Sequence, residues 1–402
     1  MQIPVTKPFF DGNEVELVKE TLTSGWVAQG PKTFEFEKKV AEHENIKYAV
    51  ATSNCTTALH LALLINNIGE GQDVIIPSFT FVATANAVCY TGATPIFADI
   101  DLDTFNISVK SIEKIINEQY VWSKEGLLNR KSNNKLAGIM PVHQFGLCAD
   151  MIQINDIARK YNLRIIEDAA CALGARINGV NQGGFGNVSC VSFHPRKCIT
   201  TGEGGMVFTN NEEQYIKLKE LRSHGAKVSE VKRAADNKGY LLPGYSELGY
   251  NYRLSDIQSA IGLAQTEKLD YILEKRRSLA KRYNELLKDF EWIKCPTEPE
   301  GYYHTYQSYV CLLVDNKDLN VSNNALRNRI MDHLADSGVQ TRQGTHAVHT
   351  LAYYQRKYKH EVMEYMNAYI ADQLSFTLPL YPQQTEAEQD YVVEQLVKAY
   401  EE

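Results

Sequence analysis

Lys197 lies in the stretch SFHPRKCITTGEGGM (residues 192–206), between a strand-like run and a glycine-rich turn. Pro195 breaks the strand, and GEGG forces a tight turn after it. In such a loop a lysine amine attacks a carbonyl group when burial or a nearby cation, here Arg196, favours its neutral form. A lysine taken alone is far more often a surface residue, so Lys197 is a candidate only in combination with other groups. Glu203, within the same turn, is interpreted as structural.

Two acids, Glu167 and Asp168, end the apolar stretch RIIEDAA and precede small residues. A carboxylate at the carboxyl end of a strand in an α/β sheet faces the binding crevice. There it could hold a metal ion, orient a base or pair with a protonated ring nitrogen. The alternative, that the acid caps a helix, stays open at this point.

The stretch SNCTTAL (residues 53–59) joins a strand to a helix through small hydroxyl residues. The first turn of a helix leaves N–H groups unpaired, and these groups favour an anion such as a phosphate. Simple capping by Ser53 or Asn54 is the alternative, and this stretch alone does not decide between the two.

Taken together, the three features match the needs of pyridoxal 5′-phosphate (PLP). That cofactor requires a phosphate cup, a carboxylate for its pyridinium nitrogen and a lysine for its aldehyde. A dinucleotide site is not predicted, because no GxGxxG stretch follows the first strand. A metal site is not predicted either, because the candidate histidines lie far apart and form no ligand-spaced pair: His143, His194, His346 and His349.

The composition is typical of an ordinary globular protein, with 402 residues, 44% apolar and 23% charged. No apolar run approaches the roughly 18 residues needed to cross a bilayer. The N-terminus has no basic segment followed by an apolar one, so we expect a cytoplasmic protein.

A net charge of −7 without a basic block argues against nucleic-acid binding. The cluster EKRRSLAKR (residues 274–282) is interpreted as a solvated helix face.

Apolar runs bounded by glycine, proline and polar clusters alternate between strand-like and helix-like patterns. This alternation predicts an α/β fold with a mostly parallel central sheet and helices on both faces. Strands are expected at residues 48–53, 73–78, 94–100, 136–146, 163–170, 189–194 and 204–210, and helices at 56–69, 81–92, 108–120 and 151–162.

The pattern changes near residue 254. We therefore expect a large α/β domain over residues 1–255 and a smaller α+β domain over residues 256–402. Residues 255–290 predict one long helix or two in line, and the polar stretch 122–135 predicts a surface excursion. A strand at 306–314 and helices at 323–338 and 386–402 complete the second part.

Several motifs in order resemble the DegT/DnrJ/EryC1 family of sugar aminotransferases, nearly from end to end. They are SNCTTALHLAL, PSFTFVATANAV, GATPIFADID, PVHQFG, IIEDAACALGA, SFHPRKCITTGEGGMVFTN, LRSHGA and GYNYRLSDIQSAIGLAQ. The resemblance implies a fold-type-I PLP aminotransferase that acts as a homodimer with active sites shared between subunits.

The resemblance also implies roles for individual residues. Lys197 would bind the cofactor's aldehyde and then move a proton, while Asp168 would pair with the pyridinium nitrogen. Phe81 would stack on the pyridine ring. The phosphate would be held by Thr56, Thr57 and Ser192, and by Asn251 across the dimer interface. Dehydratase relatives carry histidine where this chain has Lys197, so transamination is the better interpretation.

Three positions depart from the family pattern. Cys171 stands where Gln or His is often found near the cofactor's phenolic oxygen, and a thiol is a weaker hydrogen-bonding group. Cys55 replaces a frequent glycine, which suits a helix start but not a positive φ angle. The family's PLH appears as AVH, which places His349 on the substrate side, with His346 as its competitor.

The implied reaction passes an amino group from L-glutamate to a nucleotide-linked keto sugar, most often a 4-keto-6-deoxy sugar, for surface polysaccharide or glycoconjugate synthesis. Amination at C-4 is preferred over amination at C-3. A sugar dehydratase and a non-catalytic PLP-binding regulator are the alternatives.

Because the chain is net negative, binding of an anionic substrate depends on local cations. The candidates are Arg253, Arg342 and Lys32, and Trp26 could pack against the sugar or base or be a core residue.

Overall fold

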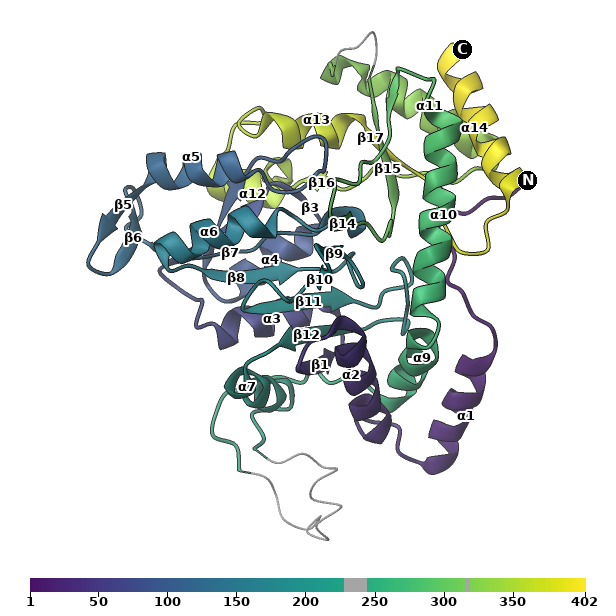
Figure 1. Ribbon diagram of the computed structural model, residues 1–402. Helices are drawn as coiled ribbons and strands as arrows, with labels where there is room; N and C mark the ends of the chain where they lie inside the picture. The colour runs from purple at the N-terminus through teal and green to yellow at the C-terminus, as the bar shows by residue number, and fades with distance from the viewer. Residues whose placement is uncertain (228–243, 315–318) are drawn as a thin grey trace.

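The computed structural model describes residues 1–227, 244–314 and 319–402, and its centre is a nine-stranded sheet (Figure 1). The strand order is β1-β12-β11-β8-β7-β2-β4, with the hairpin β5–β6 attached to β7. Strands β11, β8, β7, β2 and β4 run parallel, and β12 is antiparallel to both of its neighbours. The predicted mostly parallel sheet is confirmed. Its strands are β1 (Tyr48–Thr52), β2 (Gln72–Pro77), β4 (Thr94–Ala98), β5 (Tyr120–Ser123), β6 (Gly126–Asn129), β7 (Lys135–Ile139), β8 (Arg164–Asp168), β11 (Val188–Ser192) and β12 (Gly205–Thr209).

Helices cover both faces of this sheet, as predicted. Alternate strand residues enter two separate buried clusters: on β8, for example, Ile166 joins one cluster and Ile165 the other. The first cluster includes residues of α3 (Cys55–Ile65), α4 (Val82–Tyr90) and α7 (Glu212–Arg222). The second includes residues of α2 (Pro31–Glu44), α5 (Val109–Gln119), α6 (Met151–Tyr161) and α9 (Asp256–Thr266).

The C-terminal part builds a second, three-stranded sheet in the order β13-β15-β17. Residues 255–290 form two helices, α9 and α10, because the helix breaks after Thr266 and resumes at Leu269. Side chains of both α9 and α10 join the buried cluster of the first sheet, so the boundary at residue 256 remains a prediction. The elements are α10 (Leu269–Leu287), β13 (Ile293–Lys294), β15 (Tyr309–Leu313), α11 (Asn324–Asp336), α12 (Ala352–Tyr358), α13 (Met366–Leu374), β17 (Ser375–Leu378) and α14 (Glu386–Glu401).

Some elements were not predicted. The N-terminal helices are α1 (Asn13–Ser24) and α2, which both pack on α9. The polar stretch 122–135 contains most of the hairpin β5–β6, which adds strands to the sheet rather than leaving it. Five short strands form two small additional sheets: β3 (Phe79–Thr80) pairs with β16 (His346–Ala347), and β9 (Arg176–Ile177) pairs with β10 (Val180–Asn181) and β14 (Tyr302–Tyr303).

The basic cluster on α10 is not simply a solvated face. Arg276 is buried and its Nη1 donates to the backbone carbonyls of Tyr306, Gln307 and Leu380. Arg277 pairs with a glutamate and Arg282 with an aspartate. No helix among the described residues combines the length and the apolar character that a membrane crossing requires.

Candidate active site

Lys197 follows β11 in the loop before β12, at the carboxyl end of the parallel strands. Its side chain is half-buried, and Nζ lies 3.0 Å from the Sγ of Cys171, to which it donates. Cys171 in turn follows β8 by three residues. The structure therefore brings the predicted lysine beside the segment that carries Asp168, at the sheet edge where α/β proteins bind ligands.

Asp168 is the last residue of β8 and is buried. Thr84, on α4, donates its hydroxyl to Oδ2 at 2.7 Å, and the N–H of Ala170 donates to Oδ1 at 3.2 Å. Burial raises the pKa of this carboxyl above its ordinary value, and the two hydrogen bonds and the charge of Lys197 act in the opposite direction. A bound cation at this carboxylate would relieve the cost of burying it.

The predicted phosphate cup is the start of α3. Asn54 is the N-cap: its Oδ1 accepts from the Thr57 N–H at 3.0 Å, which confirms the capping alternative for this residue. The Thr57 hydroxyl lies 3.3 Å from the Ser53 hydroxyl and donates to the Asn54 carbonyl at 2.8 Å. Thr56 is half-buried, and no hydrogen bond involves its hydroxyl within the described residues. Cys55 is the first residue of the helix, as its compatibility with a helix start implied.

Gly205 explains how β12 reaches this helix. A Cβ atom on Gly205 would lie 2.5 Å from the carbonyl carbon of Asn54, a distance that real Cβ atoms do not adopt. Gly205 also pairs with Ser192 across the β11–β12 ladder. The absence of a side chain therefore lets Ser192 and the start of α3 lie close together.

The pKa of the Cys55 thiol depends on charged groups from two other segments of the chain. Burial raises the pKa of its thiol well above the ordinary value, and the charge of Asp168 adds to that effect. Lys197 acts in the opposite direction. A thiol at the start of α3, the carboxylate at the end of β8 and the amine after β11 thus interact electrostatically, although they come from three separate segments of the chain.

Phe81 and His346 belong to two segments that β3 and β16 join. Phe81 is the N-cap residue of α4, and 61% of its side chain is exposed. Its neighbour Thr80 pairs with His346 between β3 and β16. His346 is exposed as well, so both side chains are available to a bound molecule.

His349 does not face a substrate. Its ring is fully buried, with Nδ1 2.5 Å from the Ser78 hydroxyl and Nε2 2.9 Å from the carbonyl oxygen of Val362. Burial lowers the pKa of the ring, which favours the neutral form. Since both nitrogens are occupied inside the protein, the expectation that His349 contacts the substrate is corrected, and His346 is the better candidate.

The segment after residue 250 approaches the same helix. The N–H of Ser53 donates to the Tyr252 carbonyl at 2.9 Å. Asn251 is exposed, and its Oδ1 accepts from Nε of Arg253 at 3.1 Å. The structure thus places the predicted phosphate ligand Asn251 and the predicted substrate ligand Arg253 beside each other at the protein surface.

Trp26 belongs to a loop and not to either buried cluster. Its Nε1 donates to the Gln29 carbonyl at 3.1 Å, and its ring covers Gly30, where a Cβ atom would collide with it. Asp256 holds the next turn by accepting from the N–H groups of Gly30 and Thr33. The alternative of a core tryptophan is therefore wrong, and a role toward the substrate stays a prediction.

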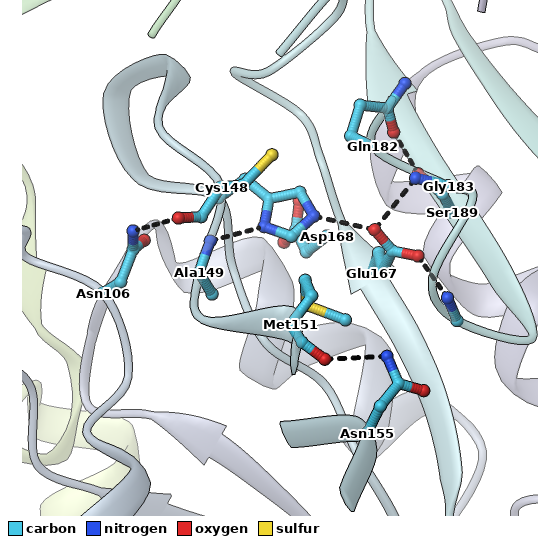
Figure 2. A network of polar contacts seen from close by, with 12 residues as sticks. Asn106, Cys148, Ala149, Met151, Asn155, Glu167, Asp168, Gln182, Gly183 and Ser189 are labelled. Atoms are coloured by element: carbon cyan, nitrogen blue, oxygen red, sulfur yellow. Dashed lines mark hydrogen bonds and ion pairs between the residues drawn. The ribbon is translucent and has the colours of Figure 1, made fainter. Parts of the chain in front are cut away.

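Glu167 has a different environment from Asp168 (Figure 2). Its carboxylate accepts from the N–H groups of Gly183 at 2.9 Å and Gly186 at 2.5 Å. It also lies 2.9 Å from Nε2 of His143, whose Nδ1 accepts from the Ala149 N–H. Because Nδ1 accepts, the imidazole carries its proton on Nε2 and donates it to Glu167. This acid is fully occupied in the core, which leaves Asp168 for chemistry.

Thr84 was not singled out from the sequence. It lies inside the stretch TFVATANAV as an ordinary helical residue, and its hydroxyl also lies 3.0 Å from that of Thr80. The available signal was its position one turn after the start of a helix that begins at the sheet edge. Only the fold shows that this helix passes next to β8.

Comparison with known proteins decides the family. A model of the DegT/DnrJ/EryC1/StrS aminotransferase family matches residues 9–397. The chain belongs to this family. GDP-perosamine synthase of Escherichia coli O157:H7 is 36% identical over 400 residues, which is 99% of this chain and 98% of that protein.

Solved structures agree over the whole length. Helicobacter pylori PseC, an aminotransferase of pseudoaminic acid biosynthesis, superposes with a TM-score of 0.87 at 25% identity and full coverage of both chains. The PLP form of Spr1654 from Streptococcus pneumoniae gives 0.86 at 26% identity, covering 100% of this chain and 99% of that one.

The chain is therefore an aminotransferase, and PLP is its cofactor. The residues fit that group on their own chemistry: a buried carboxylate with few donors, a half-buried amine near it and hydroxyls at a helix start.

Proposed function

We propose that this aminotransferase passes the amino group of L-glutamate to the ketone of a nucleotide-linked 4-keto-6-deoxy sugar. The observation that carries the proposal is the position of Lys197, whose Nζ lies 3.0 Å from Cys171 on the segment that follows Asp168, at the sheet edge where α3 begins. The 36% identity with GDP-perosamine synthase supports a sugar nucleotide as the acceptor. The product would be an amino sugar for surface polysaccharide or glycoconjugate synthesis.

When bound, PLP supplies an electron sink that makes a proton on the amine-bearing carbon removable. In this proposal the Nζ of Lys197 would take that proton and deliver it to the cofactor within the same half-reaction, and it would move a proton in the opposite direction in the second half. Asp168 holds the ring nitrogen in its protonated form, and Thr84 fixes the carboxylate through Oδ2. Phe81 covers one face of the ring, and Thr56, Thr57 and Ser192 hold the phosphate.

Cys171 stands 3.0 Å from the amine and is assigned the contact near the cofactor's phenolic side. His346, Trp26 and Arg253 are proposed to contact the sugar nucleotide, since all three have exposed or half-exposed side chains. Lysine at position 197 favours transamination over the dehydratase alternative, because a dehydratase of this fold carries histidine there.

We also propose a homodimer in which Asn251 of one subunit reaches the cofactor phosphate of the other. The exposure of Asn251 supports this arrangement, as does the 85% exposure of the apolar residue Leu248, three positions before it in the chain. The cytoplasmic location expected from the sequence likewise stays a prediction.

The proposal is tested with purified protein and a panel of GDP-, UDP- and dTDP-linked keto sugars. The PLP-loaded protein should absorb in the visible range, and L-glutamate should bleach that band. Adding the correct keto sugar should restore the band and release an amino sugar whose position, C-4 or C-3, is read by mass spectrometry and NMR. A band that does not respond to glutamate would count against this donor, and a panel without any acceptor would count against the sugar.

A further inference from the structure

A pocket with an unusual set of side chains lies next to the Lys197 loop. It encloses about 230 Å³ of space that is partly open to solvent, and it separates the loop after β11 from β17 and the N-terminal segment. Two arginines line it, Arg196 and Arg342. Its other walls come from Val5, Thr6, Gln307, Ser308, Thr377, Leu378 and Leu380.

The two arginines lack acidic partners. Within the described part of the chain, neither Arg196 nor Arg342 forms an ion pair. Burial and the nearby charge of Arg196 lower the pKa of the Arg342 guanidinium below its ordinary value. A third arginine, Arg276, is buried behind the wall and donates to the carbonyls of Gln307 and Leu380. Three guanidinium groups therefore raise the positive potential of one small space.

Two hydroxyl groups of the pocket are also unpartnered. The Oγ1 atoms of Thr6 and Thr377 are buried, and neither has a hydrogen-bond partner among the described residues. Thr377 itself is only 2% exposed, and its N–H donates to the Arg342 carbonyl at 2.7 Å, so its position is fixed. Buried hydroxyls without partners are rare because they cost free energy, which points to a ligand that accepts from them.

The groups around His194 connect this pocket to the amine. Burial, Arg196, Lys197 and Arg342 hold the pKa of His194 below its ordinary value, and Glu203 is the acid that opposes them. His194 also binds this loop directly: its Nδ1 accepts from the Arg196 N–H at 3.2 Å, and its carbonyl accepts from the Lys197 N–H at 2.8 Å. Gln307 ties the loop in place by donating to the Arg196 carbonyl at 2.6 Å.

We propose that this pocket binds a carboxylate of the dicarboxylic amino donor and so holds the donor beside Lys197. The inference rests on the proposed function, which names L-glutamate. Arginine forks and hydroxyl donors match a carboxylate, and Val5, Leu378 and Leu380 suit a short methylene chain.

The first experiment measures binding without turnover. Glutarate, an unreactive dicarboxylate, is titrated calorimetrically into the PLP-loaded protein and into Arg342→Gln. We expect a 10–100-fold weaker Kd for the variant, because a charge-assisted pair is lost. Thr377→Val should weaken binding about 2–5-fold without lowering stability. Arg342→Lys should recover part of the loss, and Arg329→Gln, an exposed arginine on α11, should behave as wild type.

The second experiment separates the two half-reactions. Bleaching of the visible band by glutamate should need a 10–100-fold higher concentration in Arg342→Gln, whereas the return of the band with the keto sugar should keep its KM. If wild type is bleached by glutamate and both Arg342→Gln and Thr377→Val retain wild-type glutarate affinity, the pocket assignment is wrong. If wild type binds glutarate but glutamate leaves the band unchanged, the proposed donor is wrong while the pocket stands.

Competition of two other anions with glutarate tests whether the pocket is specific for a dicarboxylate. Inorganic phosphate that displaces glutarate at equal concentration would overturn the dicarboxylate assignment in favour of a general anion site. GDP that displaces glutarate from wild type would assign the pocket to the sugar nucleotide instead. Should Arg342→Gln fail to fold, Arg342→Lys and Thr377→Val carry the same comparison.

Discussion

The two carboxylates at the end of β8 are neighbours in the chain and opposites in their surroundings. Glu167 points to the face of the sheet that Ile165 also faces, and it accepts from His143, Gly183 and Gly186 (Figure 2). Asp168 points to the other side, accepts from Thr84 and Ala170, and lies near Lys197. The comparison teaches that full hydrogen bonding marks a structural acid, whereas a buried acid with few donors and an amine nearby marks a reactive one.

The largest effect is expected on the reactive side. Lys197→Ala should lower single-turnover transamination by at least about 10³-fold, because it removes the amine that is proposed to move the proton. The fold should persist, since the lysine side chain is half-buried and its amine donates to one thiol. Stopped-flow absorbance measures the rate, and Lys110→Ala, an exposed lysine on α5, is the control. Residual turnover near the wild-type rate would refute the assignment.

Replacing each of the two acids by its amide, one at a time, tests the difference between them. Glu167→Gln should lower the free energy of unfolding by about 2–4 kcal/mol, because an amide N–H₂ would face backbone or imidazole donors. Asp168→Asn should not lower stability but should lower transamination about 100-fold or more. Denaturant unfolding and single-turnover kinetics on both variants test this. A stable but inactive Glu167→Gln would reverse the comparison.

Thr84→Val removes the hydroxyl that fixes Asp168. A hydrogen bond to a charged group contributes about 1.5–3 kcal/mol, so we expect a rate roughly 10-fold lower or more. Thr84→Ser retains the hydroxyl and should recover most of the rate. The readout that separates positioning from simple destabilisation is the absorbance maximum of bound PLP, which should shift in Thr84→Val and return in Thr84→Ser.

The smallest effect concerns pH. Burial raises the pKa of Asp168 above 3.8, so the folded, PLP-free protein binds more protons than the unfolded chain between the two pKa values. The stability gained from this difference is complete below the unfolded pKa and is lost as pH rises through the folded pKa. The Asp168→Asn variant has no carboxyl to titrate, so it does not lose stability in this way as pH rises. Its stability relative to wild type should therefore increase between pH 4.5 and 8, measured by urea unfolding; a constant difference would contradict a raised pKa.

Much of this site could be predicted because its parts are marked by local patterns. Lys197 is bounded by a proline and glycines, and Asp168 ends an apolar strand, so spacing and fold class place both at one sheet edge. Thr84 carries no such mark, because a threonine inside a helix has many neutral uses.

Tertiary contacts explain the other differences. The burial of His349 depends on Ser78, 271 positions away in the chain. Arg276 looked solvated because its partners are backbone carbonyls, which no side-chain pattern reveals. The hairpin β5–β6 is polar because it lies at the far end of the sheet (Figure 1), where strand pairing and not burial defines it.

Gly205 has a consequence for how this enzyme can change. The space between β12 and the first turn of α3 has no room for even one carbon atom beyond the backbone. Ser192 and the start of α3 are both proposed to hold the phosphate, so a missing side chain keeps the two halves of that phosphate site together. New substrates therefore have to be accommodated by the loops around the site and not by moving β12 away from α3.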